Sequence, residues 1–159
     1  MARWEDVAAE APALAAEAMG FLDAHVHKTL ATVRRDGSPR ISGIETRVHD
    51  GDLYLGMMHR SLKARDLQRD PRFALHSGSE DPPGWPGDAT VSGKAEEITD
   101  PARIDAVLGP VGPSRPPGEL HLFRLDVEEV VTVRLGDLRD HLVVTSWRAG
   151  RGVRRMTRT

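Results

Sequence analysis

The groups with which proteins commonly bind phosphate come together in one short run, residues 57–63, which reads Met-Met-His-Arg-Ser-Leu-Lys. A β-type segment leads here directly into a predicted helix, whose first residues include the hydroxyl of Ser61 and the ammonium of Lys63. Free backbone N–H groups and the positive end of the helix dipole attract an anion at such a position. The run therefore predicts a phosphate cradle, although on these residues alone an ordinary serine cap followed by a solvated lysine is the commoner arrangement.

A further cation, Arg47, lies near the end of the preceding β-type segment. The Asp50-Gly51 pair predicts a hairpin that places the end of this segment beside the next one, so that Arg47 can approach the same point as Lys63. Two or three cations around one dianion would stabilise it. The alternative is an arginine that protects the edge of a sheet.

Other kinds of chemistry find little support. The chain has no cysteine, which excludes disulfides, a cysteine nucleophile, a zinc ribbon and an iron–sulfur cluster. Its histidines form no HExxH motif, and His25 and His27, expected on one strand face, lack a third ligand nearby, so we expect no metal site. Walker A, GxGxxG and GxSxG motifs are absent as well. No side chain is singled out as catalytic.

The composition of the chain indicates the class of protein that carries this site. The chain has 159 residues, a net charge of −2 and 39% hydrophobic residues, which suits one domain with a buried core. Near-neutral charge gives no electrostatic footprint for nucleic acid. No run approaches 18 apolar residues, and the acidic, amphipathic start does not resemble a signal peptide. We therefore expect a cytoplasmic protein that binds neither nucleic acid nor membranes.

Helical and strand patterns alternate along the chain. Residues 4–22 predict an amphipathic helix, interrupted or kinked near Pro12. Asp36-Gly37 and Asp50-Gly51 predict the turns of a three-stranded meander, and the alternation slips near Gly43, as a β-bulge or a barrel corner requires. The remaining expected elements are a helix over 61–70, strands over 72–76 and 89–98, a short helix over 100–108, a loop over 109–118, and strands over 120–135 and 141–147.

Together these elements predict a mainly β fold with six or seven strands, turn signals at the spacing typical of antiparallel barrels, and an N-terminal helix. We expect residues 1–27 to form a helical arm and residues 28–159 the barrel, within a single domain. The last twelve residues carry five arginines and no acid. They lack interleaved aromatic residues, so a solvated tail or a ligand lid is expected there rather than a nucleic-acid arm.

The order of several short motifs resembles the pyridoxamine 5′-phosphate oxidase-like split β-barrel family, which includes flavin- and deazaflavin-binding proteins. The motifs are Thr29-Leu30-Ala31-Thr32-Val33 with Asp36-Gly37-Ser38-Pro39, Ser61-Leu62-Lys63-Ala64 leading to Asp70-Pro71-Arg72-Phe73, Val91-Ser92-Gly93-Lys94-Ala95-Glu96, and Trp147-Arg148-Ala149-Gly150. The match runs from about Thr29 to the C-terminus. It departs from true pyridoxamine phosphate oxidases at Leu62 and Asp88, so the resemblance does not extend to vitamin B6 as the substrate.

The resemblance implies FMN as cofactor, with coenzyme F420 as the alternative and haem as a weaker one. It implies a homodimer with cofactor sites at the subunit interface, and Trp147 and Arg154 would reach the site from the partner. The residues expected to bind the cofactor are Ile44, Glu45, Thr46, Arg47, Met57, Met58, Ser61, Lys63, Trp147 and Arg154.

The function implied is an oxidoreductase that transfers a hydride between FMN, or F420, and a small organic substrate. One alternative is a non-catalytic cofactor or haem carrier, with His59 or His121 as the iron ligand. Another is a barrel whose site has decayed, leaving only a dimer.

Overall fold

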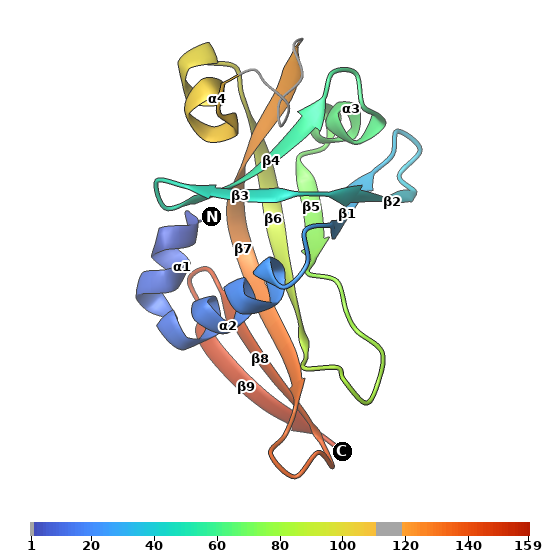
Figure 1. The fold of residues 1–159 in the computed structure, drawn as a ribbon, viewed down its shortest axis with the longest axis vertical. Helices are drawn as coiled ribbons and strands as arrows, with labels where there is room; N and C mark the ends of the chain where they lie inside the picture. Colours follow the sequence, from blue (N-terminus) through green and yellow to red (C-terminus); the bar gives the residue numbers. More distant parts are fainter. Residues whose placement is uncertain (1, 111–118) are drawn as a thin grey trace.

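The computed structural model describes residues 2–110 and 119–159. The expected loop over 109–118 falls largely outside them. The helices are α1 (Trp4–Glu10), α2 (Pro12–Asp23), α3 (Leu62–Arg69) and α4 (Pro101–Leu108), and the strands are β1 (Lys28–Val33), β2 (Pro39–Ile44), β3 (Thr46–His49), β4 (Asp52–Met58), β5 (Arg72–His76), β6 (Asp88–Ile98), β7 (Leu120–Leu135), β8 (Leu142–Arg148) and β9 (Gly152–Arg158) (Figure 1). None of the helices formed by the described residues has the length and apolar character needed to cross a bilayer.

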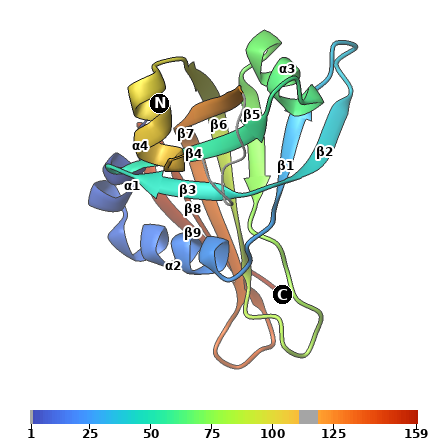
Figure 2. The same ribbon diagram turned by 45° about the horizontal axis from the view of Figure 1, so that its top comes forward.

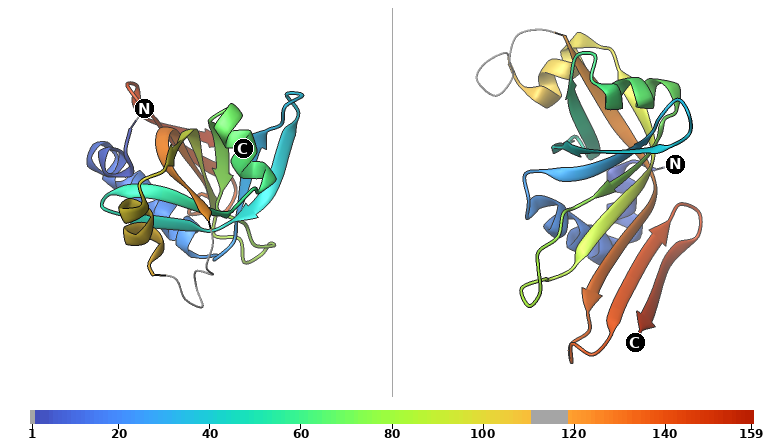
Figure 3. Two further views of the ribbon diagram at one scale, coloured as in Figure 1. Left: turned by 90° about the horizontal axis from the view of Figure 1, so that it is seen from above. Right: turned by 90° about the vertical axis from the view of Figure 1, so that its right-hand side faces the viewer.

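The sheet curls round until its two end strands follow each other in the chain. In the described residues nine antiparallel strands form one sheet, whose main path runs β2-β1-β5-β6-β7-β4-β3. The end strands β2 and β3 are consecutive and are joined through Glu45. The sheet therefore wraps into a barrel, seen best in Figures 2 and 3. This confirms the expected mainly β, antiparallel barrel with short helices.

The strand count exceeds the expected six or seven for two reasons. The second strand of the predicted meander divides at Glu45 into β2, which pairs with β1, and β3, which pairs with β4. Most of the segment 148–159, expected as a solvated tail or a lid, instead forms β9, which pairs with β8 from Gly152 to Arg158. Gly150 and Gly152 both adopt positive φ angles, which lets the chain turn back sharply between the two strands.

Two local expectations are corrected in detail. The slip expected near Gly43 is a corner two residues later, because β2 stays in register with β1 as far as Ile44. The sheet's β-bulge lies instead between β6 and β7 at Ser92 and Gly93, where a Cβ on the glycine would collide with the backbone of β7. His25 and His27 precede β1 and do not lie on a strand.

The N-terminal helices supply part of the barrel's own core. Their buried side chains, Trp4, Val7, Leu14, Ala15, Ala18 and Leu22 among them, belong to the same cluster as those of the strands. Pro12 ends the first helical run as predicted, since α1 stops at Glu10 and α2 begins at the proline. Arg3 fastens the arm by donating to both carboxylate oxygens of Asp52, at 2.9 and 3.0 Å. The division of the chain at residue 27 stays a prediction.

A buried carboxylate fixes α3 against the hairpin formed by β1 and β2. Asp66 is 3% exposed and accepts hydrogen bonds from Thr32 on β1 (2.9 Å), Arg40 on β2 (2.6 Å) and Arg69 on α3 itself (3.1 Å). Burial alone would raise the pKa of this carboxyl, but the hydrogen bonds from its three partners outweigh burial and hold the pKa below its usual value. The start of α3 is thereby held beside β2.

We predict that Asp66→Asn lowers the free energy of unfolding at pH 7 by about 2–4 kcal/mol, because it leaves a buried charge network incomplete. The pKa of Asp66 is depressed in the folded state, so its stabilisation is full above the unfolded pKa of about 4 and is lost as the pH falls through the folded pKa. The difference in unfolding free energy between wild type and Asp66→Asn, measured by urea unfolding, should therefore be smaller at pH 3 than at pH 7. The exposed loop variant Asp81→Asn serves as the control, and an equal difference at both pH values would contradict the assignment.

Candidate functional site

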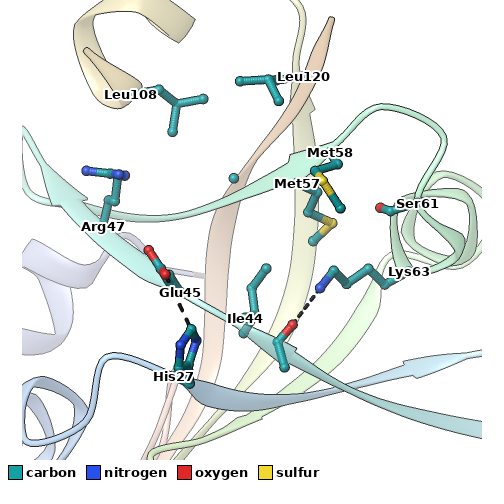
Figure 4. A pocket seen from close by; sticks show the side chains of 12 residues that line it. His27, Ile44, Glu45, Arg47, Met57, Met58, Ser61, Lys63, Leu108 and Leu120 are labelled. Carbon is teal, nitrogen blue, oxygen red and sulfur yellow. Dashed lines mark hydrogen bonds and ion pairs between the residues drawn. The ribbon is translucent and has the colours of Figure 1, made fainter. Parts of the chain in front are cut away.

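A pocket of about 390 Å³ lies where the corner between β2 and β3 faces β4, the start of α3 and the end of α4 (Figure 4). This volume is within the range usual for small-molecule sites. The residues that line it are His27, Gly43, Ile44, Glu45, Arg47, Gly56, Met57, Met58, Ser61, Lys63, Leu108 and Leu120.

One end of the pocket carries the groups of the predicted phosphate cradle. Ser61 caps α3, its hydroxyl accepting from the backbone N–H of Ala64 at 3.4 Å. Lys63 extends from the first turn of α3 across to β2, and its ammonium donates to the carbonyl of Gly43 at 2.5 Å (Figure 4). Burial lowers the pKa of Lys63, because a charged amine loses solvation there. An anion at this end would meet a hydroxyl, an ammonium and the N–H groups of a helix start.

Arg47 lies at the opposite end of the pocket from Lys63 (Figure 4). The expectation that both cations approach a single anion is therefore not met. The reason is the strand register, which pairs Arg47 with Tyr54 on β4, four residues before Met58. At the rise of a β-strand, Tyr54 lies about 13 Å along β4 from Met58, and the chain reaches Lys63 only after Met58. The pocket has one cation at each end instead of two at one point.

The walls between these ends are largely apolar. They are formed by Ile44, Met57, Met58, Leu108 and Leu120 (Figure 4). Gly56 also lines the pocket, and a Cβ there would lie 3.0 Å from a methyl group of Leu108. A largely apolar pocket with a cation at each end, and with the carboxylate of Glu45 in its lining, suits a molecule that has a large apolar part and an anionic group.

Seven of the ten residues predicted to contact a cofactor line this pocket: Ile44, Glu45, Arg47, Met57, Met58, Ser61 and Lys63. Thr46 is not among the lining residues. Trp147 is buried in the core of its own chain, 1% exposed, and its indole N–H donates to Glu10 at 2.9 Å. Arg154 is exposed on β9. Neither reaches the pocket of its own chain, and their contribution to a partner's site stays a prediction.

Sequence reasoning missed the residues that α4 and β7 bring to the pocket. Leu108 ends α4 and Leu120 begins β7. Their approach depends on a small second core, in which Val107 of α4 packs with Tyr54 and Leu122. Such long-range packing has no local signature. The local signals in this region, Asp100 as a cap and Pro101 at the first helical position, predict only where the helix begins.

The two histidines considered as haem ligands lie outside the residues that line the pocket. The rings of His59 and His121 stack with centroids 5.5 Å apart. Both nitrogens of His121 have partners, one the carboxylate of Glu97 at 2.6 Å and the other the backbone N–H of Arg60 at 3.3 Å. Iron ligation by His121 would require one of these contacts to break.

Comparison with known proteins bears on the fold and the family. The family model for Pyridoxamine 5′-phosphate oxidase matches residues 14–134. No curated protein matches the chain.

Several solved structures share the fold over most of the chain. A pyridoxamine 5′-phosphate oxidase-related, FMN binding protein from Nostoc punctiforme PCC 73102 is 19% identical, with a TM-score of 0.63 over 100% of this chain and 98% of that one. PhzG from Burkholderia lata 383, solved with tetrahydrophenazine-1-carboxylic acid, is 14% identical, with a TM-score of 0.66 over 97% and 92% of the two chains. A heme binding protein from Mycobacterium smegmatis is 18% identical, with a TM-score of 0.60 over 92% and 88%. At these identities the likeness shows the fold alone.

We predict that Gly56→Val fills part of the pocket without unfolding the protein. Valine suits a strand, and the Leu108 methyl that it meets is the end of a flexible side chain, so the free energy of unfolding should change by less than about 1 kcal/mol. Binding of the apolar anionic dye anilinonaphthalene sulfonate should weaken at least about fivefold, because the valine side chain takes the place of apolar surface that the dye would bury. Gly20→Ala, in the open helical position of α2, is the control. Unchanged dye affinity in Gly56→Val would show that the dye binds elsewhere and that this pocket is not an apolar binding site.

Proposed function

Because the chain belongs to the pyridoxamine 5′-phosphate oxidase family, we propose that it binds FMN in the pocket between the barrel corner and α3. We further propose that it is an oxidoreductase, which transfers a hydride between the flavin and a small organic substrate. A cytoplasmic location stays a prediction.

The pocket's arrangement of charge is the observation that supports this proposal. FMN joins a dianionic phosphate, through a ribityl chain, to a flat aromatic ring system with one apolar and one polar edge. Ser61, Lys63 and the first N–H groups of α3 would hold the phosphate, since they form the one end of the pocket where a hydroxyl, an ammonium and a helix start combine. The methionine and leucine side chains between the two ends would contact the ring. The chemistry of the donors present therefore fits the cofactor.

When bound, a flavin supplies the hydride chemistry at its own ring. The chain's part is to anchor, orient and shield. Arg47 would place positive charge at the end of the pocket remote from the phosphate, where it would favour an anionic, reduced ring. The absence of a catalytic triad or a general-base motif is therefore no obstacle to activity.

F420 and haem are the alternative cofactors. F420 also carries a phosphate, which the same end of the pocket would accept, and the heme binding protein from Mycobacterium smegmatis shows that the fold can carry haem. FMN is favoured over haem because the pocket holds a cradle for a phosphate, and neither His59 nor His121 lines it; the histidine in its lining is His27, which lies 4.0 Å from Glu45. Absorption spectra after titration of the apo-protein with FMN, F420 and haem separate the three, and the proposal expects a saturable complex with FMN.

A homodimer is the second part of the proposal. Three large apolar side chains are mostly exposed in this part of the chain: Met58 (74%), which lines the pocket, Leu62 (56%), which stands in the chain between the lining residues Ser61 and Lys63, and Ile41 (73%), on β2 two residues before the lining residue Gly43. Exposed apolar groups gathered beside one pocket are typical of an interaction surface. A second copy that covered them would also shield the cofactor from water.

We predict that Lys63→Met weakens FMN binding by about 1.5–3 kcal/mol, or roughly 10- to 150-fold in Kd, because it removes a charge-assisted hydrogen bond to the phosphate. Fluorescence titration of the apo-protein measures the effect. Lys94→Met is the matched control, since Lys94 is an exposed lysine on β6 outside the pocket-lining residues. Equal FMN affinity in Lys63→Met and wild type would refute the anchor.

We also predict that the wild-type protein sediments as a dimer, and that Ile41→Asp, at an exposed apolar residue outside the pocket lining, shifts it to monomer and lowers its FMN affinity at least about tenfold, because a charge cannot be buried unpaired in the interface. Leu138→Asp, equally exposed but in the β7–β8 connection, should leave both properties unchanged. A wild-type monomer with tightly bound FMN would contradict the interface assignment.

A further inference from the structure

A carboxylate and an imidazole meet behind the turn that leads into α3. Glu97 on β6 and His121 on β7 lie on neighbouring strands, with Glu97 Oε1 and His121 Nδ1 2.6 Å apart. Both side chains are largely shielded, at 26% and 15% exposure. Neither lines the pocket, so they would not touch a ligand bound there.

The second nitrogen of His121 holds the backbone of this turn. The N–H of Arg60 donates to His121 Nε2 at 3.3 Å. Arg60 has a φ of 60°, in the left-handed region that costs a residue with a side chain about 1 kcal/mol. Its neighbour Ser61 is the cap of α3. The imidazole therefore supports an unfavourable backbone conformation directly before the phosphate cradle.

The partners of His121 dictate its tautomer. A carboxylate only accepts hydrogen bonds, so Nδ1 must carry the proton, and a backbone N–H only donates, so Nε2 must be the acceptor. His121 thus links Glu97, through Nδ1, to the backbone of the turn, through Nε2. The ring of His59, in the same turn, stacks on His121 with an angle of 11° between their planes.

Glu97 also holds the helix itself. The side-chain amide of Gln68, in the last turn of α3, donates to both oxygens of this carboxylate at 2.9 and 3.2 Å. The pair therefore contacts α3 at two places, at the turn before its first residue and near its last. Two points of attachment fix the direction in which the start of a helix points.

We infer that Glu97 and His121 are positioning residues for the anion site at Ser61 and Lys63. This inference rests on the proposed FMN function. The pair acts through the backbone of Arg60 and through α3, and it sets where the cap hydroxyl and the helix N–H groups stand when a phosphate binds.

The test compares FMN with riboflavin, which has the same ring and lacks the phosphate. His121→Phe keeps an aromatic ring for stacking and removes both hydrogen bonds. It should raise the Kd of FMN about five- to tenfold, the effect of one hydrogen bond, and leave the Kd of riboflavin within about twofold. A variant that only loosened the fold would weaken both ligands together.

Two variants at Glu97 compare loss of the carboxylate with its replacement by an amide. Glu97→Leu should reproduce the loss of phosphate preference, and Glu97→Gln should restore most of it, because the amide oxygen still accepts from the imidazole. Glu96→Gln is the matched control, since Glu96 is the adjacent residue and pairs with Arg124 on β7 instead. If His121→Phe does not fold, Gln68→Met removes only the contact to α3 and should lower the FMN to riboflavin preference in the same direction.

The outcomes separate the two claims. A wild-type protein that binds FMN no better than riboflavin would overturn the phosphate site, and with it the proposed function. A wild-type preference for FMN that survives unchanged in His121→Phe and Glu97→Leu would overturn the positioning role alone. Equal weakening of both ligands by these variants would also overturn it.

Discussion

The candidate site depends on the closure of the sheet at Glu45. The strands on either side of this residue, β2 and β3, stand at opposite ends of the main path of the sheet, so their direct connection forces the sheet to curl. The curl brings the corner opposite β4 and α3 and leaves a pocket between them (Figure 4). A flat sheet of the same strands would leave Arg47 and Lys63 facing no common space.

Two polar networks then hold α3 over this pocket from different sides. Asp66 ties the helix to β1 and β2, while Glu97 and His121 tie it and the preceding turn to β6 and β7. A binding site has a higher affinity when its groups are already in place, because the free energy of binding is then not reduced by the entropy lost in ordering them. The start of α3 is held in this way, with Lys63 reaching across to Gly43.

The elements with strong local signals were predictable. Asp-Gly turns, the break at Pro12 and the cap at Ser61 all depend on neighbouring residues, and the structure contains each of them. The strand β9 was missed because most of its side chains are exposed on both faces, so it shows no apolar alternation. The end of the pocket at which Arg47 lies depends on the register between β3 and β4, and the contribution of Leu108 depends on how α4 packs. Neither can be derived from spacing along the chain.

The central claim is that one end of this pocket receives the phosphate of a flavin. A crystal structure of the protein with FMN tests it most directly. The account predicts the phosphate within hydrogen-bond distance of Ser61 Oγ and Lys63 Nζ, with the ring between Met57 and Leu120. A phosphate bound at Arg47, or a flavin bound outside the pocket, would contradict it.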